Sequence, residues 1–174
     1  YYVGFCYEEG IGVEEDESLA FEWFKKSAEN GFPESCYKVG EWYFLGRGTE
    51  VNEEEAMKWF QLAAEKGNSQ GLLMMGLFYY YGRVVERNRN KSIQLLEKAA
   101  SLGNKESKYL LCVHYLQDER NPSNQTKGFQ LLNGLIHHPE VIISLGMCHE
   151  FGLGVEKNDK KAFELYSESR NHYF

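Results

Sequence analysis

The sequence predicts an all-α protein, a right-handed α-solenoid of about five stacked helix–turn–helix repeats. Two observations carry this prediction. Gly-x-Gly occurs at residues 10–12, returns at 46–48 and occurs again at 152–154, and a period in the thirties indicates one supersecondary unit repeated along the chain. The apolar residues between the glycine pairs are spaced three and four apart, which is typical of helices and not of strands.

The same stride places small residues in one column of the repeat: Gly4, Gly40, Gly76 and Gly146, with Cys112 in the fourth unit. A position without bulk is what a close helix crossing requires. We expect units at residues 1–31, 32–67, 68–103, 104–138 and 139–174. One helix pair cannot bury the apolar stripes of both its helices, whereas stacked pairs can, so a single repeat array over residues 1–174 is predicted.

Each unit is expected to contain a first helix, a turn with the glycine pair, and a second helix. The predicted first helices are residues 1–9, 33–45, 69–81, 105–117 and 139–151. The predicted second helices are residues 17–30, 53–66, 89–102, 125–137 and 159–171.

The boundaries of these helices have their own signals. Pro33 and Pro139 open first helices, where a missing N–H is tolerated. His137 and His138 are expected to cap the helix that precedes Pro139. Short polar side chains that can cap free amides stand at the starts of the second helices, at Asp16, Asn52, Asn88, Asn124 and Asn158. Glycines that stop a helix follow three second helices, at Gly31, Gly67 and Gly103.

Composition excludes several classes of function. The net charge is −7, and residues 1–66 hold 15 acidic and 6 basic side chains, a balance of −9. An acidic chain is a poor match for nucleic acid, whose affinity comes mainly from phosphate neutralisation. No apolar run approaches the 18 residues of a membrane span, so direct membrane insertion is not expected. The chain begins at Tyr1 inside a helical segment without Met, and we interpret it as a piece of a longer protein.

No catalytic residue, cofactor or metal is expected. The glycine pairs follow no strand and precede no Gly-Lys-Ser/Thr, so they form no phosphate loop. A zinc site would need Cys112, His114, Cys148 and His149 to converge, but Cys112 and His149 fill core columns whereas His114 and Cys148 fall in another. Packing is therefore the expected role of these four side chains. Nothing in the chain predicts an enzyme.

The residues Gly10, Gly12, Val13, Asp16 and Ala20, followed by Trp23-Phe24 and a closing Ala-x-x-Gly, resemble the Sel-1-like repeat, a relative of the tetratricopeptide repeat. The resemblance covers essentially the whole chain. It is weaker in the third unit, where Val84 replaces the second glycine, and weakest in the fourth, where Asp118 and Arg120 replace both. It implies a non-catalytic adaptor that holds other proteins. The alternative is a regulatory or oligomerisation module of a larger enzyme or assembly.

The cysteines bear on the compartment. Some members of that family staple each helix pair with regularly spaced cysteines, but Cys6, Cys36, Cys112 and Cys148 lack that spacing. Buried thiols in a reducing compartment favour a cytoplasmic location. Two glycosylation sequons, at Asn90 and Asn124 in the expected turns, keep the endoplasmic reticulum lumen open as the alternative.

In tetratricopeptide-like solenoids the first helices line the concave face, so the resemblance implies a binding surface there. The stripe of the first helices that points away from their packing column mixes aromatic side chains with carboxylates. Its members are Phe5, Glu34, Tyr37, Glu41, Phe44, Leu77, Tyr80, Tyr81, Tyr109, Val113, Met147, Glu150 and Phe151. Such a surface suits a protein or peptide with apolar anchors and basic residues.

Alternatives remain for parts of this surface. Individual aromatics such as Phe44 and Tyr80 are equally well explained as wedges between neighbouring units. The basic turn with Arg83, Arg87, Arg89 and Lys91 is either a solvated loop or a contact for an acidic partner. Self-association is a further expectation, because an array without capping repeats leaves apolar end faces.

Overall fold

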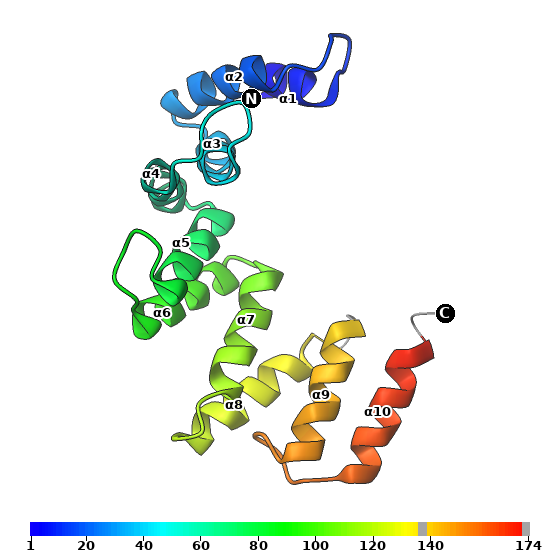
Figure 1. The fold of residues 1–174 in the computed structure, drawn as a ribbon. Coiled ribbons are helices and arrows are strands. Elements are labelled where there is room, and N and C mark those ends of the chain that lie inside the picture. The colour runs from blue at the N-terminus through cyan, green and yellow to red at the C-terminus, as the bar shows by residue number, and fades with distance from the viewer. Residues whose placement is uncertain (136–138, 172–174) are drawn as a thin grey trace. The chain divides into compact units, whose positions relative to one another are not determined.

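The computed structural model describes residues 1–135 and 139–171, and within them the chain forms ten α-helices and no β-strand (Figure 1). The predicted all-α array of helix pairs is confirmed. The helices are α1 (Tyr2–Glu9), α2 (Glu17–Glu29), α3 (Pro33–Leu45), α4 (Glu53–Glu65), α5 (Ser69–Tyr81), α6 (Arg89–Ser101), α7 (Lys105–Leu116), α8 (Pro122–Asn133), α9 (Pro139–Phe151) and α10 (Asp159–Asn171). The predicted caps at His137 and His138 lie outside the described residues.

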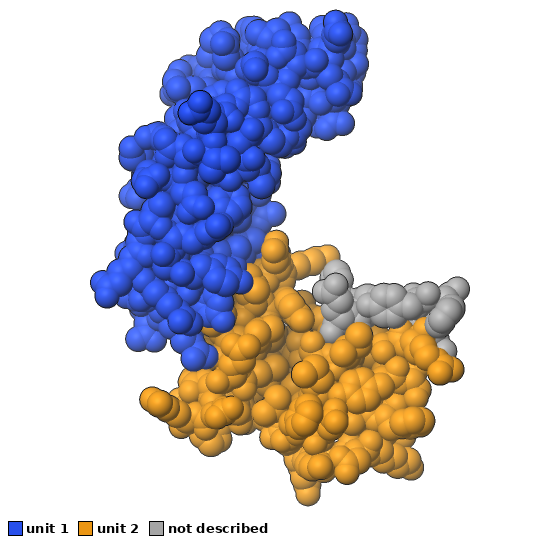
Figure 2. Space-filling model, in the orientation of Figure 1, with its two compact units in different colours: residues 1–104 blue, residues 105–174 orange. Residues whose placement is uncertain are grey.

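The helices divide into two compact units (Figure 2). Unit 1 is residues 1–104 with α1 to α6, and unit 2 is residues 105–174 with α7 to α10. Within each unit, every helix packs against its neighbours in sequence. This consecutive packing is what a stack of helix hairpins requires, because each hairpin buries its apolar flank against the next.

Four of the five predicted N-terminal caps form. In each, the side-chain oxygen accepts a hydrogen bond from the amide three residues on, as from Leu19 N–H to Asp16 at 2.9 Å and from Glu55 N–H to Asn52 at 3.0 Å. Asn88 and Asn158 do the same for α6 and α10. At the other ends, Gly31, Gly67 and Gly103 follow second helices with φ between +85° and +89°, a conformation that other residues rarely adopt.

The predicted start of α8 at residue 125 is wrong. The helix begins at Pro122, and Asn121 is its cap, accepting from the amides of Ser123 and Asn124. Asn121-Pro122 combines a capping side chain with a proline at the first helical position, which is a stronger start signal than Asn124. The turn before the helix lacks the glycines that the other units use to take positive φ, and it is shorter. The sequons at Asn90 and Asn124 therefore lie in the first turns of α6 and α8, not in loops as predicted.

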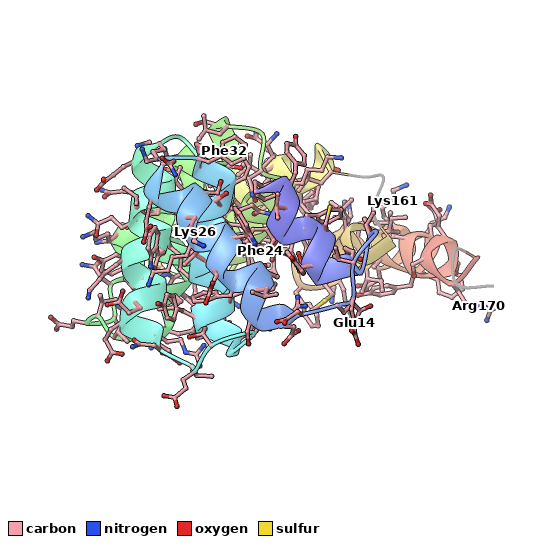
Figure 3. The ribbon with its side chains drawn as sticks, turned by 90° about the horizontal axis from the view of Figure 1, so that it is seen from above. Glu14, Phe24, Lys26, Phe32, Lys161 and Arg170 are labelled. Atoms are coloured by element: carbon pink, nitrogen blue, oxygen red, sulfur yellow. The ribbon has the colours of Figure 1, made fainter. Side chains whose placement is uncertain are left out.

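The glycine column sets the close approach of the two helices in a pair. A Cβ on Gly4 would lie 2.9 Å from the ring of Phe24, which sits between α1 and α2 (Figure 3), and a Cβ on Gly40 would lie 2.8 Å from the ring of Phe60. In the fourth unit Cys112 occupies this column. There the room comes from the partner helix, since a Cβ on Gly128 would lie 3.1 Å from the Cys112 carbonyl.

The second glycine of each pair serves the contact between repeats. A Cβ on Gly48 would overlap the carbonyl of Glu17, and a Cβ on Gly154 would overlap the carbonyl of Gln125. Glu17 and Gln125 each begin the second helix of the preceding repeat or lie in its first turn. A Cβ-free residue at this point therefore lets one repeat rest against the backbone of the one before it.

Candidate partner-binding face

All thirteen residues of the predicted surface lie on first helices, and none of them is buried. In unit 1 they come from α1, α3 and α5, and in unit 2 from α7 and α9. Phe5, Glu34, Tyr81, Met147 and Phe151 are exposed, and the other eight are half-buried. The first helices thus present a mixed apolar and acidic surface in each unit.

Unit 2 has an apolar groove of about 270 Å³ along this surface. Tyr109 and Val113 of α7 line one wall, and Ser144 and Met147 of α9 line the other. The hydroxyls of Tyr109 and Ser144 lie 3.4 Å apart. Met147 keeps 45% of its surface exposed. Three predicted site residues, Tyr109, Val113 and Met147, are therefore brought to a single groove.

The inner side of the groove is closed by buried thiols. Cys112 and Cys148 both line it and belong to the same core cluster, although the sequence placed them in different columns. That expectation was wrong because the core between repeats is continuous. Burial raises the pKa of Cys112 to about 12 and that of Cys148 to about 11. Both thiols are protonated at neutral pH and are poor nucleophiles and poor metal ligands.

The histidines of the considered zinc site have other neighbours. His149 lies edge-on to Phe129, with ring centroids 5.5 Å apart, and His114 is buried. The described residues contain no group of three or more His, Cys, Asp or Glu side chains placed to hold a metal ion. Packing explains the positions of Cys112, Cys148 and His149.

The outer end of α9 is acidic and aromatic. Phe151 keeps 62% of its surface exposed. Glu150 accepts a hydrogen bond of 2.6 Å from the Tyr166 hydroxyl, and burial together with this bond raises the pKa of Tyr166 to about 12. Glu150 is thus fixed in place beside the second helix of its own repeat.

In unit 1, arginines from the turn after α5 cover the predicted aromatics. The Arg83 guanidinium lies 4.9 Å from the ring centroid of Phe44, and that of Arg87 lies 5.6 Å from the Tyr80 ring. Phe44 also packs on buried Phe78 with ring centroids 5.7 Å apart. Much of the Phe44 ring therefore stabilises the contact between repeats, and the open part of this aromatic surface is Tyr81.

The basic turn is accordingly more than a solvated loop. Arg83 also pairs with Glu53 at 3.3 Å, and the Lys91 ammonium lies 4.3 Å from the Tyr79 ring centroid. These contacts hold the turn against its own unit. Cation–π contacts of this kind contribute about 0.5–1 kcal/mol each at exposed sites.

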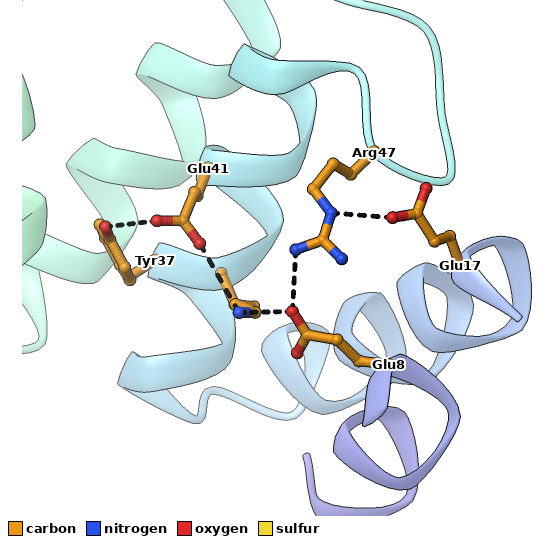
Figure 4. Close-up of polar contacts among 6 residues, drawn as sticks. Glu8, Glu17, Tyr37, Glu41 and Arg47 are labelled. Carbon is orange, nitrogen blue, oxygen red and sulfur yellow. Dashed lines mark hydrogen bonds and ion pairs between the residues drawn. The ribbon is translucent and has the colours of Figure 1, made fainter. Parts of the chain in front are cut away.

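A charged network occupies the first-helix side of unit 1 (Figure 4). The Glu8 side chain is only 5% exposed, and its Oε1 lies 2.9 Å from Lys38 Nζ and 3.0 Å from Arg47 Nη1. Arg47 Nε donates to Glu17 at 2.9 Å. Glu8, Lys38 and Arg47 come from three segments, α1, α3 and the turn after α3. The network therefore ties the first repeat to the second.

The network reaches the predicted stripe at Glu41. Glu41 accepts a hydrogen bond of 2.8 Å from the Tyr37 hydroxyl and lies 3.7 Å from Lys38 Nζ. Arg47 lies 4.7 Å from the ring centroid of Trp42, which is fully buried. Buried Glu8 Oε2 and Trp42 Nε1 have no hydrogen-bond partner among the described residues. The carboxylates of this region are thus largely engaged internally, and Glu34 is the exposed one in the stripe.

The repeat pattern of the sequence agrees with a known family. The family profile of the Sel1 repeat matches residues 1–32, 33–68, 69–104 and 139–171. The chain belongs to the Sel1 repeat family. The matches leave out residues 105–138, the stretch in which Asp118 and Arg120 replace the glycine pair. Sel1 repeats generally act as protein-interaction modules and are generally non-catalytic.

Solved structures show the same fold. A protective antigen of uropathogenic Escherichia coli with an SLR fold is 31% identical over 99% of this chain, with a TM-score of 0.88, and this chain spans 37% of the antigen's length. A Sel1 repeat protein from Oxalobacter formigenes is 26% identical with a TM-score of 0.86, over 98% of this chain and 71% of that one.

An immunity protein from Pseudomonas aeruginosa is 20% identical with a TM-score of 0.59, over 96% of this chain and 65% of that one, a likeness of fold alone. A search of curated proteins finds no significant match. Across the described residues, every helix is too short or too polar to cross a bilayer.

Sequence reasoning missed the partners that fix the Sel1 surface. Arg47 and Lys38 were not among the predicted site residues. A signal for Arg47 exists in the repeat alignment, since Arg47 and Arg83 share one column, and their acidic partners Glu17 and Glu53 share another. Two oppositely charged columns at a constant offset indicate an ion pair between repeats.

Proposed function

We propose that this Sel1 repeat chain is a non-catalytic adaptor that binds a segment of another protein along its first helices. The unit 2 groove takes an apolar side chain of that segment. The observation that carries the proposal is the groove itself, because Tyr109, Val113 and Met147 from two first helices line one apolar hollow. Exposed apolar surface in a concave site is where binding energy concentrates in protein–peptide complexes.

The chemistry of the surface describes the partner. The groove volume falls just below the roughly 300–1,000 Å³ of small-molecule sites, which favours an anchoring side chain over a cofactor. Exposed Phe151 extends the apolar surface beyond the groove. In unit 1, the acidic excess of residues 1–66 and exposed Glu34 favour basic residues elsewhere in the segment. Such charges act mainly on orientation and association rate.

A random-peptide selection against the intact chain tests the proposal. Selected peptides should carry aromatic or aliphatic anchors with Lys or Arg, and Met147→Glu should weaken their binding at least ~10-fold, because it puts a charge into the apolar groove. Phe163→Glu, an equal change on a second helix, should leave the affinity unchanged. Selected peptides that bind wild type and Met147→Glu equally would refute a role for the groove.

The alternative function, an oligomerisation module within a larger assembly, rests on different residues. These are the exposed apolar side chains of α1 and α10, the first and last helices of the chain.

A further inference from the structure

The contact between repeats in unit 1 has a defined aromatic core. Phe21 of α2 stacks on Trp42 of α3 with ring centroids 6.3 Å apart, and meets Tyr43 edge-on at 5.1 Å. This contact leaves Phe21 only 8% exposed. Each second helix here offers an aromatic face, and the next first helix covers it.

Unit 2 repeats the contact in register. Phe129 of α8 occupies the Phe21 column, and it meets His149 of α9, which occupies the Tyr43 column. Cys148, in the column of Trp42, is buried beside it. The geometry of repeat stacking is therefore a property of these columns and does not depend on one particular pair of repeats.

The last helix presents the same face with nothing on it. Phe163 of α10 stands in the column of Phe21 and Phe129, yet 72% of its surface is exposed. Beside it a hollow on α10 is lined by Tyr166, Ser167 and Arg170 (Figure 3 labels Arg170). In unit 1 the corresponding stripe of α2 is filled by Trp42, which contacts Phe24 at 5.2 Å as well as Phe21.

The first helix presents the complementary face. Val3 of α1 is 45% exposed, whereas Val39 in the same column of α3 is fully buried in the core cluster that contains Phe21. Gly12, the second glycine of its pair, has no atom within 4 Å of where a Cβ would lie. Its counterparts Gly48 and Gly154 both rest on the preceding repeat.

We propose that a second copy of this chain occupies these faces head to tail, with α1 of one copy on α10 of the other. The occupant follows from continuity with the interface inside the chain. The α10 face is built to receive a first helix, and the α1 face is built to rest on a second helix, so each face complements the other and not itself. An interface between two different faces does not close on a pair, so association continues beyond a dimer or closes as a ring.

Sedimentation equilibrium of the intact chain tests the proposal. The weight-average mass should rise above 20.2 kDa with concentration, reaching at least twice that value by about 0.1 mM, where low-micromolar contacts are occupied. Phe163→Glu and Val3→Glu should each remain at 20.2 kDa, because each places a charge in one half of the interface. Phe151→Glu, an equal change on the partner-binding face, should associate like wild type.

Mixing the two monomeric variants provides the decisive arm. Phe163→Glu keeps an intact α1 face and Val3→Glu keeps an intact α10 face, so an equimolar mixture should form a heterodimer that grows no further. Circular dichroism shows that both variants are folded, as expected for substitutions at exposed sites. A wild-type mass of 20.2 kDa at every concentration would overturn the proposal. Persistent self-association of either variant, or a mixture that stays monomeric, would do the same.

Discussion

Val84 shows how a single residue departs from the repeat. It holds φ at +49°, and no other non-glycine among the described residues has a positive φ. The equivalent positions are Gly12, Gly48 and Gly154, all between +62° and +73°. Backbone geometry at this point is imposed by the repeat, and a β-branched side chain is strained in it.

Val84→Gly should therefore stabilise the protein by about 1 kcal/mol, the relief of strain less the extra freedom that glycine gives the unfolded chain. The free energy of unfolding from urea titration measures this. Val51→Gly, an equal change at an exposed turn position without positive φ, should be neutral or destabilising. Equal effects of the two substitutions would show that Val84 is not strained.

The buried thiols of unit 2 give the fold a pH dependence. The pKa of Cys112 is raised to about 12 and that of Cys148 to about 11, against 9.0 for a free thiol. Their stabilising effect is complete below pH 9, where both are protonated in the folded and the unfolded state. It is lost as pH rises through 9 towards 12, because unfolding then releases protons.

Stability should accordingly fall between pH 9 and pH 11 with a slope on the order of 1 kcal/mol per pH unit for each thiol. The double variant Cys112→Ala/Cys148→Ala should show a shallower slope over the same range, since Tyr166 and the lysines still titrate. Urea unfolding at several pH values measures both. Parallel slopes for the two proteins would mean that these thiols ionise as freely in the folded state as in the unfolded chain.

At the scale of the helices, the sequence predicted nine of the ten starts to within a residue. The signals were local: capping side chains, prolines, and glycines at positive φ. The start of α8 was wrong because alignment to the 36-residue stride pointed to Asn124, whereas the local pair Asn121-Pro122 determined the cap. Where the glycine pair is missing, the stride no longer fixes the turn.

The helix crossings give a matched pair of glycines in α5. A Cβ on Gly71 would lie 2.8 Å from the Phe60 carbonyl, which is backbone and cannot move aside, whereas one on Gly76 would lie 3.1 Å from the flexible Leu96 side chain. Gly71→Ala should destabilise by about 1–3 kcal/mol. Gly76→Ala should be close to neutral, because alanine's helix propensity offsets a small shift. Thermal unfolding distinguishes them, and equal losses would contradict this explanation.

The candidate surface was predictable at the level of positions but not of contacts. Helical periodicity placed its thirteen residues on the first helices, where none is buried. It could not show that Arg83 and Arg87 cover Phe44 and Tyr80, because those arginines come from a turn whose path depends on the strained backbone around Val84. The groove likewise depends on how α7 and α9 pack, which periodicity does not determine.

At the scale of the whole chain, two kinds of surface are separate. The first helices carry the partner-binding face, whereas α1 and α10 carry uncovered halves of the interface between repeats. Binding of a partner and stacking of copies therefore use different residues, Met147 and Phe163 being representative. Substitution of one should leave the other activity intact.

Partner binding at the unit 2 groove is measured most directly by NMR of methyl-labelled methionines. The chain has four, and Met147 is the one in the groove, while Met57, Met74 and Met75 lie in unit 1. On titration with a peptide selected from a random library, the Met147 methyl signal, assigned with Met147→Leu, should shift most and that of Met57 on its second helix should not move. A bound peptide that leaves the Met147 signal unchanged would contradict the account.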